Sequence, residues 1–131
     1  MRLTTDKPVM EMGMWELSHN CCYIGPEKNV RYRDYDRDED ARELIAKCME
    51  SSGVFDADEI GALLADPESF DDCLLDCTQF PIESQDGMVA NLYRLVVANA
   101  ELREALKRYE DVGTVEEFRA CKERSEANAA E

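Results

Sequence analysis

Carboxylates at alternate positions are the first feature of this sequence that could do chemistry. They occupy one short segment, at Asp34, Asp36, Asp38 and Asp40. An EF-hand calcium loop requires Gly at its sixth position and Glu at its twelfth. Counting from the first aspartate places Glu39 and Ile45 there, and counting from the second places Ala41 and Lys47. Neither register fits, so the sequence predicts no calcium site.

Cysteine and histidine are the other candidates for metal binding or nucleophilic catalysis. The chain has one histidine, His19, and six cysteines, at positions 21, 22, 48, 73, 77 and 121. No two cysteines have the CxxC spacing of a zinc knuckle, and one histidine near Cys21 does not define a catalytic dyad. Cys48, Cys73 and Cys77 fall on the apolar faces of predicted helices, where a reduced thiol packs as a small hydrophobe. We therefore expect no metal, no cofactor and no enzymatic activity.

Net charge is the most unusual property of the chain. Thirty acidic and 15 basic side chains give a formal net charge of −15. Residues 1–33 hold five basic and four acidic side chains, residues 34–86 hold three and 17, and residues 87–131 hold seven and nine. The excess therefore lies in the middle section. Such a surface repels phosphate, so direct binding to nucleic acid or to an anionic membrane is not expected, whereas a basic protein would be attracted.

The acidic middle section has two interpretations. It could be only a highly solvated surface that keeps the protein soluble. Alternatively, its carboxylates could imitate the phosphates of a nucleic acid and occupy a basic groove in a partner protein. The residues that we predict to bind such a partner are Asp34, Asp36, Asp38, Glu39, Asp40, Glu43, Glu68, Asp71, Asp72 and Asp76.

The pattern of apolar residues predicts the elements that position these side chains. A chain of 131 residues has the length of one domain, here with an N-terminal segment (1–33), an acidic helical section (34–86) and a C-terminal section (87–131). Alternation on both sides of Gly25-Pro26 predicts a small β-hairpin in the first segment. Helices are predicted at about 39–51, after Asp56, at about 67–77, at about 86–112 and after Thr114. The fold class is thus α+β, mainly α, with four or five helices around a long central one.

The central helix carries a regular row of side chains. Spacings of four and three residues alternate through Met88, Leu92, Leu95, Asn99, Leu102, Leu106 and Tyr109. Val and Ala residues beside this row widen the apolar face, so our main interpretation is a helix packed inside the domain. The alternative is a homodimer through Leu92, Leu95, Asn99, Leu102 and Leu106, because Asn at a central a position favours paired helices.

Two segments resemble known sequences. LREALKRYEDVGTVEEF (102–118) resembles the ending L…YEDTGLTPEE of small uncharacterised acidic proteins from phages and mobile elements in Clostridia-like gut bacteria. MWELSHNCCYIGPEKNVRYRDYDRDEDARELI (14–45) is similar to the pattern ELAHNCCY…RYRDFE…DAR of the same proteins, and together the segments cover about half of the chain. The first departs from the pattern at Thr114-Val115-Glu116, where Leu-Thr-Pro would follow the glycine. Because these proteins have no assigned activity, no functional residue can be carried over.

The resemblance implies a function. Small acidic phage proteins of this kind often inhibit host defences, including RNA-guided CRISPR nucleases with strongly basic channels. We therefore expect an anti-CRISPR-like inhibitor in the cytoplasm of the host bacterial cell, acting through its acidic surface. The chain shows no apolar run long enough to span a membrane and no secretion signal, which favours the same location. The alternative is a structural or accessory phage protein that dimerises through the central helix, with acidity serving only solubility.

Overall fold

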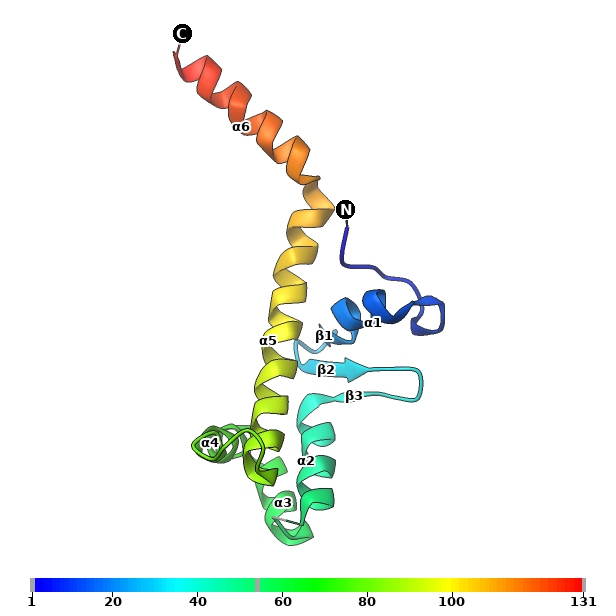
Figure 1. Ribbon diagram of the computed structural model, residues 1–131, viewed down its shortest axis with the longest axis vertical. Helices are drawn as coiled ribbons and strands as arrows, with labels where there is room; N and C mark the ends of the chain where they lie inside the picture. The colour runs from blue at the N-terminus through cyan, green and yellow to red at the C-terminus, as the bar shows by residue number, and fades with distance from the viewer. Residues whose placement is uncertain (1, 54, 131) are drawn as a thin grey trace.

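The fold is organised along one long helix, against which a small sheet and shorter helices pack. The structure is a computed structural model and describes residues 2–53 and 55–130. Its elements are a 3₁₀ turn η1 (Val9–Glu11), α1 (Met14–Asn20), β1 (Cys22–Ile24), β2 (Val30–Arg33), β3 (Asp38–Asp40), α2 (Ala41–Ser52), α3 (Ala57–Leu64), α4 (Pro67–Cys77), α5 (Gln85–Val112) and α6 (Val115–Ala130) (Figure 1).

The predicted α+β, mainly α, fold class is confirmed. A long central helix is present as α5, and the described residues form five further α-helices, in agreement with the predicted four or five around it. The fifth of these is α1, at residues 14–20, a segment where the sequence predicted no definite helix. In the described part of the chain, none of the helices has the length and apolar composition that crossing a membrane requires.

The sheet contains the predicted hairpin and one further strand. β1 and β2 are antiparallel, with Cys22 opposite Tyr32, and β2 also pairs with β3, with Arg33 opposite Asp38. The sequence of β3, Asp-Glu-Asp, has no strand propensity of its own. It is extended because its backbone pairs with β2, and its last residue, Asp40, then caps α2 by accepting the backbone N–H groups of Arg42 and Glu43.

The hydrophobic core lies where α2, α3 and α4 meet the N-terminal half of α5. Ile45 and Met49 of α2 and Phe70 of α4 are almost completely buried. The Phe70 ring packs edge-on against the Tyr93 ring of α5, with 5.5 Å between their centroids. α4 starts as predicted, with Asp66 as N-cap and Pro67 as its first residue, so local capping signals and this core together fix its position.

The face of α5 that contacts the core is not the predicted one. The buried residues of α5 are Gly87, Ala90, Tyr93, Val96, Ala100 and Arg103. Small residues allow close approach: a Cβ added at Gly87 would lie 2.0 Å from the carbonyl oxygen of Pro81. Our main interpretation of the regular row as a core face is therefore wrong. At about 100° per residue, that row lies roughly a third of a turn away from the buried face.

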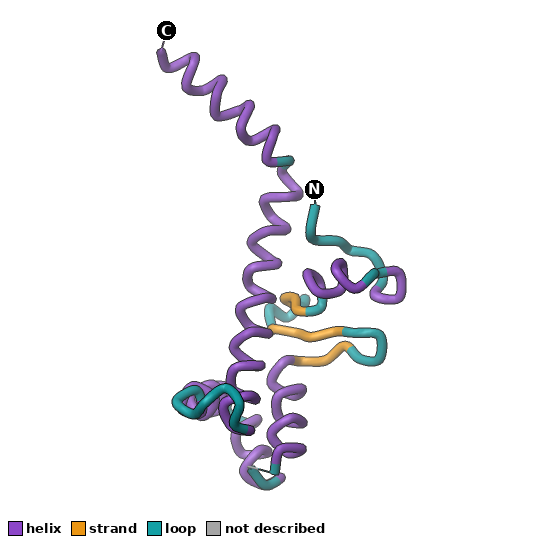
Figure 2. Tube along the Cα trace, in the orientation of Figure 1, coloured by secondary structure: helices purple, strands orange, loops and turns teal. Residues whose placement is uncertain are grey.

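The regular row of α5 is exposed to solvent. We call these seven residues the α5 stripe: Met88, Leu92, Leu95, Asn99, Leu102, Leu106 and Tyr109. Its six apolar members have exposed fractions between 36% for Leu106 and 67% for Leu102, and Asn99 is exposed as well. After α5, the chain turns at Gly113 and α6 extends away from the body of the protein (Figure 2).

Candidate protein-interaction surface

The predicted partner-binding carboxylates fall into two groups with different surroundings. The first group surrounds β3, and most of its members hold the local structure together. Asp34 accepts the backbone N–H groups of Asp36 and Arg37 over 2.8 and 3.0 Å, and these bonds, led by that from Asp36, lower the pKa of Asp34. The turn between β2 and β3 thus depends on Asp34, which is not free to bind a partner.

The neighbouring carboxylates of β3 are paired with cations. Asp38 forms an ion pair with Arg31 over 3.1 Å. Glu39 contacts Lys47 over 2.5 Å and Arg37 over 3.7 Å. Asp40, the N-cap of α2, also accepts the side-chain amide of Asn29. In this first group, only Asp36 and Glu43 are exposed and have no ion pair with any described residue.

Asp71 belongs to a polar cluster between α2, α4 and α5. Its carboxylate accepts two hydrogen bonds from the Arg42 guanidinium, over 3.1 and 3.0 Å, and one from the Tyr93 hydroxyl over 2.5 Å. Burial raises the pKa of Asp71, but the hydrogen bonds outweigh it and the net shift is downward. Burial and the neighbouring carboxylate raise the pKa of Tyr93. Asp71 therefore joins three helices and has little capacity left for a partner.

The second group of carboxylates lies on what we call the acidic lobe, residues 55–86, which contains α3, α4 and the loop that follows. The lobe has ten carboxylates, and no Lys or Arg occurs between Lys47 and Arg94. Among the described residues, Asp71 is the only one of the ten in an ion pair. The pKa of Glu59 is raised by its hydrogen bond with Asp56 and by the negative charge of that neighbour. Apart from that of Asp71, the negative charge of the lobe is therefore not neutralised by the residues that the structure describes.

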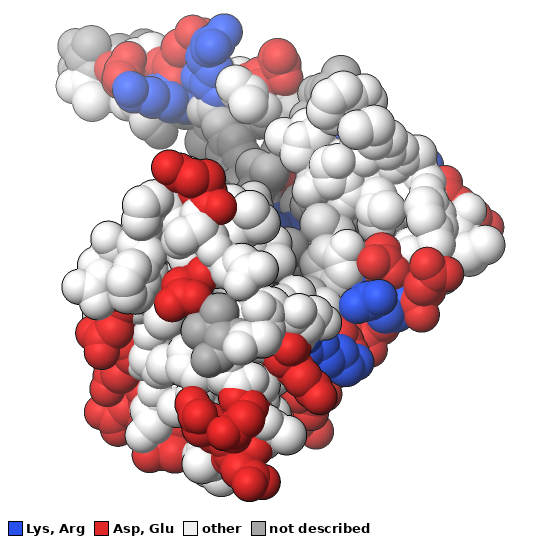
Figure 3. Space-filling model, turned by 60° about the horizontal axis from the view of Figure 1, so that its bottom comes forward, with Lys and Arg blue, Asp and Glu red and all other residues white. Residues whose placement is uncertain are grey.

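Three of the predicted residues form a row on α4. Glu68, Asp72 and Asp76 are exposed and recur every four residues, so they lie on one side of the helix, about 6 Å apart along its axis. In Figure 3, carboxylates are spread over this end of the molecule among uncharged side chains, and the Lys and Arg side chains nearest to them lie at one side. Exposed apolar side chains lie in the same lobe, at Leu75, Phe80 and Ile82.

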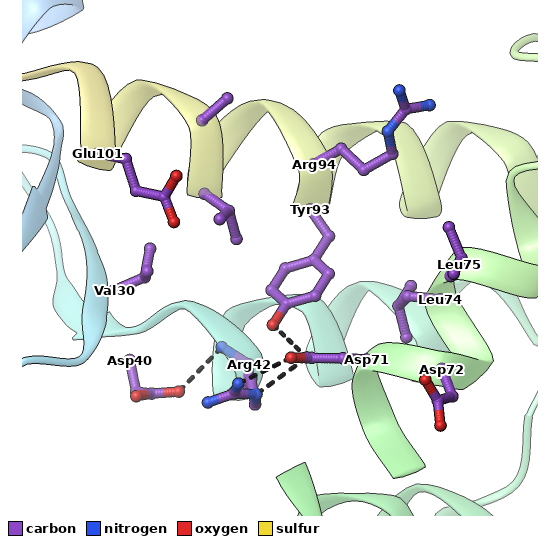
Figure 4. A pocket seen from close by; sticks show the side chains of 12 residues that line it. Val30, Asp40, Arg42, Asp71, Asp72, Leu74, Leu75, Tyr93, Arg94 and Glu101 are labelled. Carbon is purple, nitrogen blue, oxygen red and sulfur yellow. Dashed lines mark hydrogen bonds and ion pairs between the residues drawn. The ribbon is translucent and has the colours of Figure 1, made fainter. Parts of the chain in front are cut away.

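A cleft of about 590 Å³ borders the lobe. Its lining combines apolar and charged side chains from β2, β3, α2, α4 and α5: Val30, Asp40, Arg42, Asp71, Asp72, Leu74, Leu75, Tyr93, Arg94, Val97, Ala98 and Glu101. Figure 4 shows the Tyr93 hydroxyl and the Arg42 guanidinium meeting at Asp71, with Leu74 and Leu75 on the α4 side. The lining thus has apolar side chains beside charges of both signs, since Arg42 and Arg94 lie among the carboxylates.

The cysteines do not assemble into a metal site. No group of three or more His, Cys, Asp or Glu side chains in the described residues has an arrangement that could hold a metal ion. The Cys21 and Cys22 sulfurs lie 3.8 Å apart, and their hydrogen bond lowers the pKa of Cys21 to about 7 and raises that of Cys22. Burial raises the pKa of Cys77 to about 11, as expected of a core thiol.

Comparisons of the chain with protein-family models, with curated proteins and with solved structures gave no match. Function must therefore be argued from the geometry of the surface. The structure brings Glu68, Asp72 and Asp76 of the predicted set together in one row on α4, and Asp72 lines the same cleft as Asp40 of the β3 group. Five lobe carboxylates were not among the predicted residues although they are exposed: Asp56, Asp58, Glu59, Asp66 and Glu83. The missing signal was the long run without Lys or Arg, which is visible in the sequence.

Proposed function

We propose that this protein is a non-enzymatic inhibitor, encoded by a phage or mobile element, that binds a basic nucleic-acid-binding protein of the host through its acidic lobe. An RNA-guided CRISPR nuclease is the class of partner. A single observation carries the proposal: ten carboxylates occur in residues 55–86 without any Lys or Arg, and only Asp71 is in an ion pair in the described structure. The resemblance of two segments to phage proteins supports the biological setting.

The charge of the lobe favours capture by a basic groove. Unneutralised charges of one sign attract an oppositely charged surface over several ångströms and raise the association rate. The α4 row provides about one negative charge per 6 Å of helix axis, roughly half the density of one nucleic-acid strand, which has one per 3.4 Å. Carboxylates of α3 add to this density. The lobe therefore offers a partial imitation of a phosphate backbone.

Charge alone gives a weak complex, because exposed ion pairs contribute little binding free energy. Short-range contacts must come from apolar side chains that are covered by the partner. Leu75, Phe80 and Ile82 provide such contacts, and the cleft beside Leu75 can accept a side chain of the partner. The acidic lobe with these three residues is thus a complete binding surface, with a charged rim and apolar anchors.

A pull-down with purified RNA-guided nucleases, loaded with guide RNA, tests this proposal. A variant with Glu68→Gln, Asp72→Asn and Asp76→Asn removes three charges from α4. The matched control removes three charges from α6, with Glu116→Gln, Glu123→Gln and Glu126→Gln. We expect the α4 variant to lose at least about tenfold in affinity at low salt and the α6 variant to bind like the wild type. No binding of the wild type at low salt, or equal loss in both variants, would contradict the proposal.

The exposed α5 stripe favours a second candidate function. In this alternative, the protein is a structural or accessory phage protein that works as a dimer, and its charge serves only solubility. The two candidates differ in the expected role of α4. For the accessory protein, the α4 and α6 variants should be equally active in phage propagation, whereas for the inhibitor only the α4 variant should lose its effect on the nuclease.

A further inference from the structure

We propose that α5 forms a parallel, two-stranded coiled coil with α5 of a second copy of this chain, through the α5 stripe. The inference does not depend on the acidic lobe or on its partner. It begins from the position of the stripe, whose apolar residues lie outside the core although they include all four leucines of the helix. Water-exposed leucines in such a continuous row are unfavourable unless another surface covers them.

The spacing of the stripe matches a second helix. Seven consecutive positions alternate between steps of four and three residues, which is an average period of 3.5. A helix with this period buries its stripe fully only against another helix that supercoils around it. α5 is long enough for this packing, because the stripe runs through three heptads of its 28 residues. A sheet or an irregular partner would not match the period along the whole helix.

The area of the stripe is sufficient for a dimer. Each of the six apolar side chains exposes at least 36% of its surface. With roughly 100 Å² exposed for each, the stripe would bury about 600 Å² per copy and about 1,200 Å² per dimer, which reaches the range of stable interfaces. The residues at its edge add to this area.

The charge around the stripe favours a second copy over a basic partner. All seven stripe residues are uncharged, and so are Asn91, Ala98 and Ala105 at the flanking g positions. The two charged residues at flanking e positions are engaged within the protein, since Arg103 bonds to Asn20 and Glu110 to Thr4, so a basic partner would find little complementary charge here. Two identical uncharged stripes can approach without repulsion, and the small Ala98 and Ala105 side chains leave room for the second helix.

Asn99 indicates how the two copies pair. It is the central a position and the only polar residue of the stripe, and its amide donates to the Leu95 carbonyl oxygen of the same helix over 2.7 Å. Its side-chain oxygen accepts no hydrogen bond from the described residues. In a parallel dimer in register, this oxygen can accept from the Asn99 amide of the other copy. An antiparallel pairing would place it against leucine, where it would lose water without gaining a partner.

Sedimentation equilibrium of the full chain tests the dimer. We expect the wild type to form a dimer within the concentration range up to about 100 μM. The variants Leu95→Asp and Leu102→Asp should each dimerise at least 100-fold more weakly. Their helix content, measured by circular dichroism, should be unchanged. Both side chains are more than half exposed, so either substitution leaves the core intact. Leu75→Asp, at an equally exposed leucine of α4, is the matched control and should leave the dimer unchanged. A monomeric wild type, or a Leu95→Asp dimer as tight as the wild type, would overturn the proposal.

A pair of charge variants at Asn99 tests the register. Asn99→Asp and Asn99→Lys should each be monomeric, because like charges would face each other, and a mixture of the two should form a heterodimer. If the mixture stays monomeric while the wild type dimerises, the two Asn99 residues do not face each other and the parallel arrangement is wrong.

Discussion

Arg103 of α5 donates a hydrogen bond from Nε to Oδ1 of Asn20, the last residue of α1, over 2.9 Å. The same Oδ1 accepts the backbone N–H of Thr5 over 2.9 Å, and Nη2 of Arg103 donates to the carbonyl oxygen of Thr5. Asn20 is fully buried, and its amide donates to the carbonyl oxygens of Leu3 and Glu16. This one asparagine therefore connects the N-terminal segment, α1 and the C-terminal half of α5.

Loss of this asparagine should detach the N-terminal segment. Asn20→Ala removes two accepted and two donated hydrogen bonds and leaves Nε of the buried Arg103 without its acceptor, which should cost about 3 kcal/mol of unfolding free energy. Urea denaturation measures the loss, and hydrogen exchange should show faster exchange in residues 2–12. Arg108→Ala, at a side chain that is 76% exposed, is the control and should change stability by less than about 0.5 kcal/mol. Equal stability of the Asn20 variant and the wild type would contradict this role.

Glycine substitutions at two helical positions should have opposite effects. At Gly87, an added Cβ would lie 2.0 Å from the Pro81 carbonyl oxygen, so Gly87→Ala should force α5 away from the preceding loop and cost about 2–3 kcal/mol. At Gly61 of α3, no atom lies within 4 Å of an added Cβ. Gly61→Ala should therefore stabilise the protein by about 0.5–1 kcal/mol, because alanine favours the helix. Thermal unfolding of both variants checks the pair, and a stabilised Gly87→Ala would show that this close contact is absent.

Asp71 should make the protein less stable in acid. Because its pKa is lower in the folded than in the unfolded state, the stabilisation is fully present above the unfolded value of about 3.9 and is lost as pH falls through the folded pKa. Urea unfolding between pH 3 and pH 7 should therefore show a smaller decline for Asp71→Asn than for the wild type. The control is Asp72→Asn, because Asp72 is exposed and has no ion pair with the described residues. The Asp72 variant should follow the wild-type curve, and identical curves for all three proteins would exclude this effect of Asp71.

Local signals in the sequence predicted most of the elements, and long-range packing explains what they missed. Asp66-Pro67 fixed the start of α4, and the apolar pattern predicted a helix close to the observed α5, Gln85–Val112. The face of α5 that packs could not be predicted in this way. Large apolar side chains dominate the pattern that is visible in a sequence. The buried face of α5 includes the small residues Gly87, Ala90 and Ala100, and their contribution to packing depends on how closely other segments approach the helix.

The candidate surface was predicted in part for a similar reason. Glu68, Asp72 and Asp76 on α4 are exposed together because four-residue spacing in a helix is a local property. Asp38 and Glu39 of β3 look the same in the sequence, but they are neutralised by Arg31, Arg37 and Lys47, which the sheet and α2 bring to them. Which acidic residues lie next to a cation depends on the tertiary structure. The ten predicted aspartates and glutamates could therefore be divided into paired and unpaired carboxylates only once their neighbours in the fold were known.

Displacement of labelled target DNA from a guide-loaded RNA-guided nuclease is the most direct measurement of the central claim, that the acidic lobe takes the place of nucleic acid. Fluorescence anisotropy should show that the wild type and the α6 triple variant release the DNA, that the α4 triple variant requires a much higher concentration, and that added salt weakens the inhibition. The opposite result is equally clear. If the α4 and α6 variants displace the DNA equally well, or if the wild type does not displace it at all, the lobe is not the inhibitory surface.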